Sequence, residues 1–128
     1  MIKAYDGVLI VETITANRTL LPSDSDKVFL IATDALVVTL PATAEGLKYT
    51  FINSGSDGNN IITISPAAAD AIHGTFILAA SVVELSGVDD KDMINTKATA
   101  NTGDMAVIIG DGVEGWFKTE GTGIWASE

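Results

Sequence analysis

The chain contains no cysteine among its 128 residues. This absence excludes disulfide bonds, thiolate metal sites and a thiol nucleophile. Positive charge is also scarce, since seven lysines and arginines stand against 17 aspartates and glutamates, for a formal net charge of −10. Because nucleic-acid affinity comes mostly from lysine and arginine contacts to phosphates, we expect no nucleic-acid partner. A membrane surface carrying negative charge is disfavoured for the same reason.

Long apolar runs are missing as well. The longest covers residues 76–80, far short of the roughly 20 residues that span a bilayer. At the N-terminus, Asp6 and Glu12 interrupt the apolar run, which is not typical of a signal peptide. Hydrophobic residues nonetheless make up 47% of the chain, so disorder is not expected. The length and the lack of an interdomain linker predict one domain over residues 1–128, without a membrane segment.

The apolar residues that are present follow the two-residue period of β-strands. In residues 47–53, for example, Tyr49 and Phe51 fall on one face. We count about ten short strands, which predicts an all-β, single-domain β-sandwich or jelly-roll-like domain of antiparallel strands. Residues 27–32 and 36–40 are predicted to form a hairpin, as are residues 75–78 and 81–86. The last three strands are expected to form a meander, and residues 1–15 an N-terminal arm or a first strand.

Catalytic residue types are few and are not arranged in a known motif. His73 is the single histidine, with Asp70 three residues before it and Ser65 and Ser81 nearby in the sequence. No G-x-S-x-G elbow accompanies them, and a histidine beside a turn glycine is usually structural. Paired carboxylates of the glycosidase kind need a groove that the sequence does not define, and aromatic residues, which build sugar platforms, make up only 6%. We expect no enzyme activity.

Metal and cofactor sites are also not expected. Two loops are rich in carboxylates, around Asp24 and Asp26 and around residues 89–92, and calcium is bound by such oxygens. Neither loop follows the D-x-[DN]-x-[DN]-G pattern and each contains a lysine, so solvated loop carboxylates are the favoured interpretation. The chain has no phosphate-binding glycine motif of either common type. The glycines of residues 120–123 are interpreted as a hairpin turn.

Both tryptophans lie close to the C-terminus, as Trp116 and Trp125. With a turn centred on Thr122, the two rings would lie near one another across a closing hairpin, where cross-strand aromatic pairs contribute about 0.2–1 kcal/mol. A core position is favoured for Trp116. For Trp125 a core position and an outward-facing interface position are left equally open, because tryptophan is enriched at interaction hot spots.

Three segments together resemble a family of bacteriophage virion proteins. The first, residues 26–53, has a short strand pair ending in "TLP", then Gly46, then an aromatic strand. The second, "DAIHG", is similar to that family's D-x-I-x-G corner. The third, residues 100–125, resembles its closing pattern of a G-D pair, a D-G turn, a tryptophan strand and a glycine turn. The family residues in this sequence are Leu36 to Pro41, Gly46, Tyr49, Phe51, Asp70, Ile72, Gly74, Gly103, Asp104, Asp111, Gly112, Trp116, Gly121 and Gly123.

This resemblance covers most of the chain, about residues 20–125, and departs from the family in the longer "GDGVEGW" turn. It implies a β-sandwich of the jelly-roll or β-tulip type on a phage particle. The expected function is that of a head decoration, or cement, protein on the capsid exterior, a homotrimer that binds the major capsid protein and stabilises the lattice. The alternative is a receptor- or glycan-binding module of a tail fibre, tailspike or head fibre. The high negative charge would keep free copies soluble.

A decoration protein acts through interfaces, so the candidate site residues are interface residues. The segment of residues 1–11 precedes the motif block and carries an apolar face, and the loop of residues 87–101 is the second candidate. Neither catalytic, cofactor-binding nor metal-binding residues are assigned. The predicted interface residues are Ile2, Tyr5, Val8, Ile10, Met93, Ile94 and Trp125.

Overall fold

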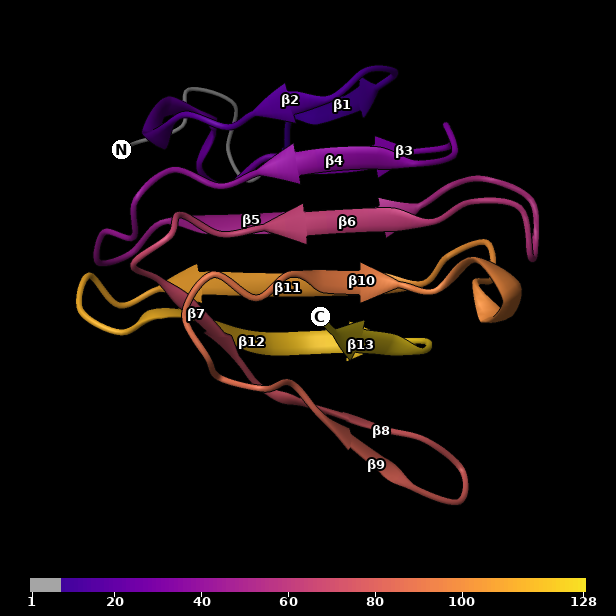
Figure 1. Ribbon diagram of the computed structural model, residues 1–128. Coiled ribbons are helices and arrows are strands. Elements are labelled where there is room, and N and C mark those ends of the chain that lie inside the picture. Colours follow the sequence, from indigo (N-terminus) through magenta and orange to yellow (C-terminus); the bar gives the residue numbers. More distant parts are fainter. Residues whose placement is uncertain (1–7) are drawn as a thin grey trace.

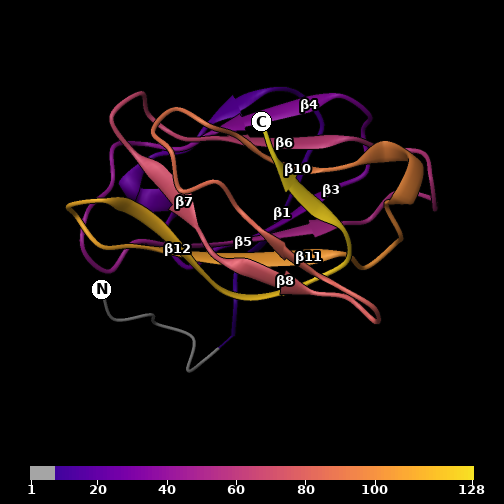
Figure 2. The ribbon, with the colours of Figure 1, turned by 60° about the horizontal axis from the view of Figure 1, so that its bottom comes forward.

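The computed structural model describes residues 8–128, which form two packed β-sheets and one separate hairpin (Figure 1). The all-β prediction is confirmed, and the two sheets lie as layers with the core between them (Figure 2). The strands are β1 (Val11–Ile14), β2 (Arg18–Thr19), β3 (Val28–Ile31), β4 (Leu36–Thr39), β5 (Lys48–Asn53), β6 (Ile62–Ser65), β7 (Ala71–His73), β8 (Thr75–Ile77), β9 (Val82–Glu84), β10 (Met93–Asn95), β11 (Met105–Gly110), β12 (Gly115–Thr122) and β13 (Trp125–Ser127). Two short 3-10 helices are η1 (Pro22–Asp24) and η2 (Lys97–Thr99).

The first sheet has the order β1-β3-β5-β11-β12-β7, and the second has the order β13-β10-β6-β4-β2. The pair β8-β9 is hydrogen-bonded to neither sheet. Over the first half of the chain, successive strands alternate between the two sheets, so that β1, β3 and β5 run parallel in one sheet and β2, β4 and β6 run parallel in the other. This half is therefore a parallel winding of three coils, in which each coil contributes one strand to each sheet: β1 and β2, then β3 and β4, then β5 and β6.

Polar corner residues hold the coils in register. Asn17, between β1 and β2, accepts a hydrogen bond at its side-chain oxygen from the Val37 N–H of the next coil (2.9 Å). Asp34, at the equivalent corner between β3 and β4, accepts one from the Ile61 N–H of the coil after that (2.9 Å). Asn and Asp are suited to such corners because their short side chains reach backbone N–H groups directly.

The winding corrects two expectations about pairing. The sheets are mixed rather than antiparallel, and residues 27–32 and 36–40 do not form a hairpin: β3 and β4 lie in different sheets, and each pairs with parallel neighbours. The physical reason is that Phe29 of β3 and Val38 of β4, both fully buried, belong to the one core that lies between the two sheets. The connection of four residues, 32–35, is long enough to cross between layers as well as to turn beside a neighbouring strand. Burial of both apolar faces decides between the two.

The last strands also differ from the expected meander. β11 and β12 form the antiparallel pair predicted for them, but β13 crosses to the second sheet and pairs with β10. The residues interpreted as a hairpin turn therefore belong partly to β12, and Gly123 lies at the crossing between sheets. Trp116 and Trp125 do not face one another across a hairpin, although both are fully buried.

Aromatic rings fill the core in two groups. Phe29 and Phe51 are register partners in the parallel winding, with ring centroids 6.0 Å apart. Tyr49 lies between this pair and Trp116, at 5.5 Å from the Trp116 ring. The second group is Trp125 with Phe76 of β8, stacked at 5.9 Å. Fully buried rings of this size remove roughly 150–250 Å² each from water and dominate the energy of the core.

A buried polar network lies at one end of the core. The Asn53 side-chain amide donates to Asn95 Oδ1 (2.8 Å), and the Asn95 amide donates to Asp104 Oδ2 (3.1 Å). All three residues are at most 6% exposed. They come from β5, β10 and the turn before β11, so the network joins the two sheets. Gly123 is packed against the Asp104 carboxylate so closely that a Cβ atom there would overlap it.

This packing predicts different costs for two alanine substitutions. Gly46 and Gly123 both have positive φ, +86° and +90°, but a Cβ on Gly46 would meet nothing within 4 Å. Gly46→Ala should therefore lower the free energy of unfolding by the backbone cost alone, about 1–2 kcal/mol. Gly123→Ala should cost about 1–3 kcal/mol more, because the Asp104 carboxylate must leave its buried partners. Urea denaturation of the two variants measures the difference, and equal midpoints would contradict this role of Gly123.

Candidate interaction surface

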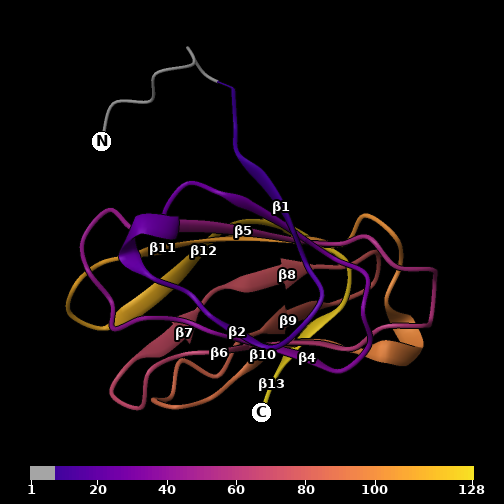
Figure 3. The same ribbon diagram turned by 90° about the horizontal axis from the view of Figure 1, so that it is seen from above.

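The most apolar exposed segment of the described chain is residues 8–11, which lead into and open β1. Val8, Leu9, Ile10 and Val11 are 64%, 54%, 39% and 56% exposed. The segment begins to join the first sheet at Ile10, whose carbonyl accepts a hydrogen bond from the Val28 N–H (2.9 Å). The described segment that leads into β1 stands away from the body (Figure 3). Four consecutive exposed aliphatic residues are unusual on a free surface and mark an interaction site.

The backbone of β1 offers a second feature of an interface. β1 is the end strand of the first sheet and pairs in parallel with β3 alone, so within residues 8–128 its outer edge has no strand partner. An unpaired strand edge presents N–H and C=O groups to which another strand can hydrogen-bond. The N-terminal surface, meaning residues 8–11 together with the outer edge of β1, thus combines apolar side chains with free backbone groups.

Four charged side chains fasten β1 to the body. Arg18 of β2 pairs with Glu12 of β1 and with Asp24 of η1 (3.0 Å). Lys27 pairs with Asp24 (2.8 Å) and with Glu12 (3.4 Å). Arg18 also lies 5.3 Å from the centre of the Phe29 ring. The four charges of this cluster sum to zero, in a chain of net charge −10.

The pairing shifts the pKa values of this charge cluster. The Arg18 hydrogen bond is the main cause that lowers the pKa of Glu12 below its ordinary 4.5. Burial alone would raise the pKa of Asp24, but hydrogen bonds from Lys27 and from the Leu21 N–H outweigh it and hold the pKa below 3.8. Close by, Tyr49 donates its hydroxyl to the Leu21 carbonyl (2.8 Å), and burial raises the pKa of Tyr49 to about 12. These contacts fix η1 and, through Asp24, the position of β1.

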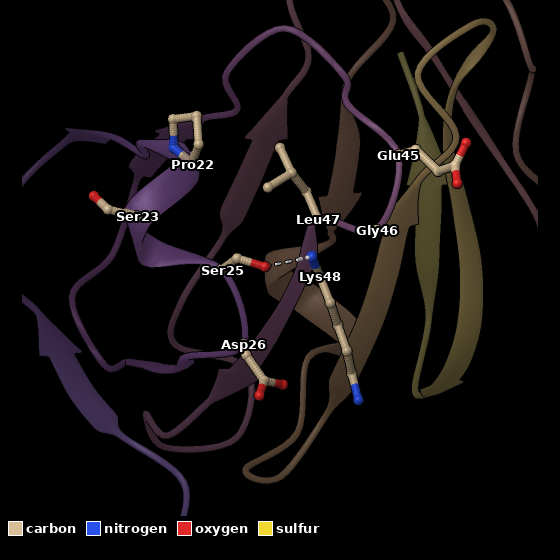
Figure 4. Close-up of a pocket in the computed structure, with 8 residues that line it drawn as sticks. All are labelled: Pro22, Ser23, Ser25, Asp26, Glu45, Gly46, Leu47 and Lys48. Atoms are coloured by element: carbon tan, nitrogen blue, oxygen red, sulfur yellow. Dashed lines mark hydrogen bonds between the residues drawn. The ribbon is translucent and has the colours of Figure 1, made fainter. Parts of the chain in front are cut away.

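A surface hollow of about 490 Å³ lies beside η1 (Figure 4). Two of its lining residues are joined by a hydrogen bond, which the Lys48 N–H donates to Ser25 Oγ (3.0 Å). A third lining residue, Asp26, has a positive φ of 72°. The remaining lining residues are surface side chains from η1 and from the loop before β5. The hollow brings together no catalytic constellation. Its lining residues are Pro22, Ser23, Ser25, Asp26, Glu45, Gly46, Leu47 and Lys48.

The predicted interface residues fall into three groups. Ile2 and Tyr5 lie outside the described residues, whereas Val8 and Ile10 are exposed as an interface requires. Met93, Ile94 and Trp125 are 0%, 8% and 0% exposed, so their assignment to an interface is corrected: they belong to the interior. The reason is that β10 lies between β13 and β6 in the second sheet, where its side chains are covered. Trp125 in addition donates its indole N–H to the Thr122 carbonyl (2.9 Å).

The residues considered for catalysis have separate partners. The Asp70 carboxylate, 6% exposed, accepts a hydrogen bond from the Thr43 N–H (2.8 Å). The His73 ring stacks on Phe117 at 4.9 Å, and Ser81 lies exposed at the turn of the β8-β9 hairpin. The structure therefore does not assemble a Ser-His-Asp triad from these three side chains.

The two carboxylate loops make different contacts within the protein. Asp24 is part of the charge cluster, and the backbone of Asp92 exchanges two hydrogen bonds with that of Glu128 (2.9 and 3.1 Å). Within residues 8–128 no three His, Cys, Asp or Glu side chains come together as metal ligands. In the same part of the chain, no helix has the length and apolar character to cross a membrane.

Two aspartates of the motif segments act as turn residues. Asp111 Oδ1 accepts hydrogen bonds from the N–H groups of Val113, Glu114 and Gly115 (2.9, 2.9 and 3.0 Å), and the Gly115 bond is the main cause of its lowered pKa. Asp104 accepts from the Asn101 N–H in the same manner (2.9 Å). These motif residues therefore determine the fold rather than a binding site.

Comparison with known proteins adds no relative. No protein-family model matches the chain, and no curated protein matches it. The candidate site thus rests on geometry: an exposed apolar segment on an unpaired strand edge, held by a neutral cluster of four charges. Leu9 and Val11 also belong to this surface: they lie in the candidate segment of residues 1–11, of which Val8 and Ile10 were the described residues predicted individually. The charge cluster was not predicted, because it depends on the register of β1 against β3.

The charge cluster predicts a pH dependence of stability. Because the pKa values of Glu12 and Asp24 are lower in the folded chain than their ordinary 4.5 and 3.8, their contribution is present above those values and is lost as the pH falls through and below them. The free energy of unfolding should therefore fall below about pH 4.5. Glu12→Gln should lower the free energy of unfolding at pH 7 by at most about 1 kcal/mol, since Glu12 is partly exposed. It should also make the decrease of that free energy at acid pH, the acid limb of the stability curve, less steep.

The matched control is Glu120→Gln, which removes an exposed carboxylate on β12. That variant should leave the acid limb as steep as in the parent protein. Urea denaturation at a series of pH values measures both. A Glu12→Gln variant with an unchanged acid limb would show that the cluster does not stabilise the N-terminal strand.

Proposed function

We propose that the chain is a structural protein of a bacteriophage particle, a capsid decoration protein that binds the outside of the major capsid lattice and stabilises it. The observation that carries the proposal is the N-terminal surface: four exposed aliphatic residues beside the free edge of β1. The resemblance of the motif segments to virion β-domains supports the class of partner. The all-β sandwich agrees with the fold that this resemblance implies.

The geometry suggests how such binding would work. An extended segment of the capsid protein adds as a strand beside β1, where backbone hydrogen bonds supply affinity. Val8 and Leu9 are then buried against the partner, each contributing about 1.5–3 kcal/mol. The neutral charge cluster beneath β1 adds no repulsion, whereas the net charge of −10 keeps free copies apart in solution. One copy that contacts two neighbouring capsomers, or a homotrimer that contacts three, stabilises the shell by adding contacts across their boundary.

A second candidate is the receptor- or glycan-binding module of a fibre. One observation favours it: Phe117 is 39% exposed and stacks on His73, which also lines a hollow of about 350 Å³ with Glu84 and Ser86. An aromatic face beside polar groups is suited to a sugar ring. Specific binding on a glycan array without affinity for capsids would favour this candidate over the first.

The proposed surface is tested by adding charge to it. The double substitution Val8→Asp and Leu9→Asp should weaken binding to shells of the phage whose genome carries this sequence, since two apolar contacts of about 1.5–3 kcal/mol each are lost. That loss corresponds to at least about a hundredfold in affinity. Binding is measured by co-sedimentation of purified protein with shells that lack it. Val113→Asp, at a position 80% exposed in the β11-β12 turn, is the control and should bind as the parent does.

The function itself is tested on the particles. Shells loaded with the parent protein should resist heat better than bare shells, with a higher melting temperature by calorimetry. Equal melting temperatures, or no binding of the parent protein to shells, would contradict the decoration function. Parent-level binding of the Val8 and Leu9 variant would leave the function in place but refute the N-terminal surface as the contact.

A further inference from the structure

The β8-β9 hairpin is a second exposed apolar element, and it lies at the other end of the molecule from β1. In Figure 1 it projects past β12 and β13, whereas β1 and β2 lie at the opposite side. Its three register pairs are Thr75 with Glu84, Phe76 with Val83 and Ile77 with Val82. Within residues 8–128 neither strand is hydrogen-bonded to any further strand.

The inner face of the hairpin is anchored in the body. Phe76 is 1% exposed and stacks on Trp125, and the Lys118 ammonium group covers its ring at 4.5 Å from the centroid. The same ammonium group donates to the Thr75 carbonyl (2.6 Å). At the base, the Leu85 N–H donates to the Gly74 carbonyl (2.8 Å). The projecting part of the hairpin is therefore held in a fixed direction.

The outer face is apolar and almost bare. Ile77 and Val82 are direct cross-strand partners, so their side chains lie together on this face, at 83% and 63% exposed. No other large apolar side chain of the described residues is as exposed as Ile77. Residues 75–83, which include the tip of the hairpin, contain no charged side chain, in a chain with a net charge of −10. The charge on this face is the exposed Glu84, opposite Thr75 at the base of the hairpin. The body supplies nothing that covers the pair.

These properties favour a second copy of this chain as the molecule that covers the outer face of the hairpin. Two copies of so acidic a chain repel one another over most of their surface, and contact between them costs least where charge is absent. A two-stranded hairpin with both edges free is marginally stable in water and gains from further strands or an apolar cover. A second hairpin of the same kind supplies an equally uncharged tip around Ile77 and Val82, with Glu84 two residues away at the base, and equally free edges. Such a contact is self-complementary, as an isologous interface requires.

We propose that the β8-β9 hairpin is the self-association element of this protein, packing its Ile77–Val82 face against the same face of a second copy. Two aliphatic side chains per copy bury far less than the roughly 800 Å² per partner of a standard interface. The contact is therefore weak between free copies and becomes effective when copies are held side by side, where the effective concentration reaches the millimolar range. The proposal does not depend on what the N-terminal surface binds.

The absence of cysteine in the chain allows a direct test. Ile77→Cys and Val82→Cys each introduce a single thiol on the outer face. Oxidised with copper–phenanthroline, separately and as a mixture, these variants should form disulfide-linked dimers more than about tenfold faster than Val113→Cys, because a bond requires Cα atoms within about 7 Å. Val113 is a matched control at 80% exposure on a different turn. Equal rates for all three thiols would overturn the proposal.

A charge pair provides the independent readout. Ile77→Glu and Ile77→Lys are each expected to abolish the concentration-dependent rise in sedimentation coefficient that the parent chain should show up to about millimolar concentration. An equimolar mixture of the two variants should restore it, because opposite charges then meet across the contact. Since Ile77 is exposed, both variants should keep the parent's urea midpoint. A parent chain that remains monomeric throughout, or a variant that associates as the parent does, would refute the hairpin contact. Dimers that form equally well in the parent and in the Ile77 variants would show that the chain self-associates through another surface.

Discussion

The hydrogen bonds from Asn53 to Asn95 and from Asn95 to Asp104 are the interaction on which the rest of the structure depends. They join a strand of the parallel winding, a strand of the second sheet and the turn that enters β11. A buried amide or carboxylate without its partner costs about 1–3 kcal/mol, so these bonds must form together or not at all. The two halves of the chain are thereby folded as one unit, and Gly123 is required because the crossing to β13 passes directly over Asp104.

Charge determines where such a unit can meet another molecule. The carboxylates of the described surface mostly face solvent, and the exceptions are used inside the fold, as with Asp24 in the charge cluster and Asp70 beneath Thr43. Two exposed places carry little net charge: the N-terminal surface, beside the cluster in which four charges cancel, and the tip of the β8-β9 hairpin, where the stretch of residues 75–83 has no charged side chain. Apolar exposure gathers at both, which is expected if burial there is completed by partners.

Local pattern predicted the parts of the fold that local physics controls. The inward faces of Tyr49 and Phe51 and the β8-β9 hairpin followed from alternation and turn residues. The crossing after Ile31 did not, because a four-residue connection containing Asp34 suits a hairpin as well as a crossing between sheets. The winding left no repeat to detect, since the register from Val11 to Val28 to Thr50 takes steps of 17 and then 22 residues. The site was predictable only as an apolar N-terminus, because the cluster of Glu12 with Lys27 requires that register.

The two apolar surfaces differ in the kind of partner that each can serve, and their positions make them compatible. A free strand edge beside exposed side chains accepts an extended segment of another chain, whereas a closed hairpin face accepts a second flat apolar face. Because they lie at opposite ends of the sandwich (Figure 1), occupation of one does not block the other. A copy bound through β1 would still present Ile77 and Val82 to its neighbour, and a contact too weak for free copies would gain from the proximity of bound ones. If both proposals hold, the separation of the exposed apolar residues has a physical reason: a single larger apolar patch would hold free copies together before they met a partner.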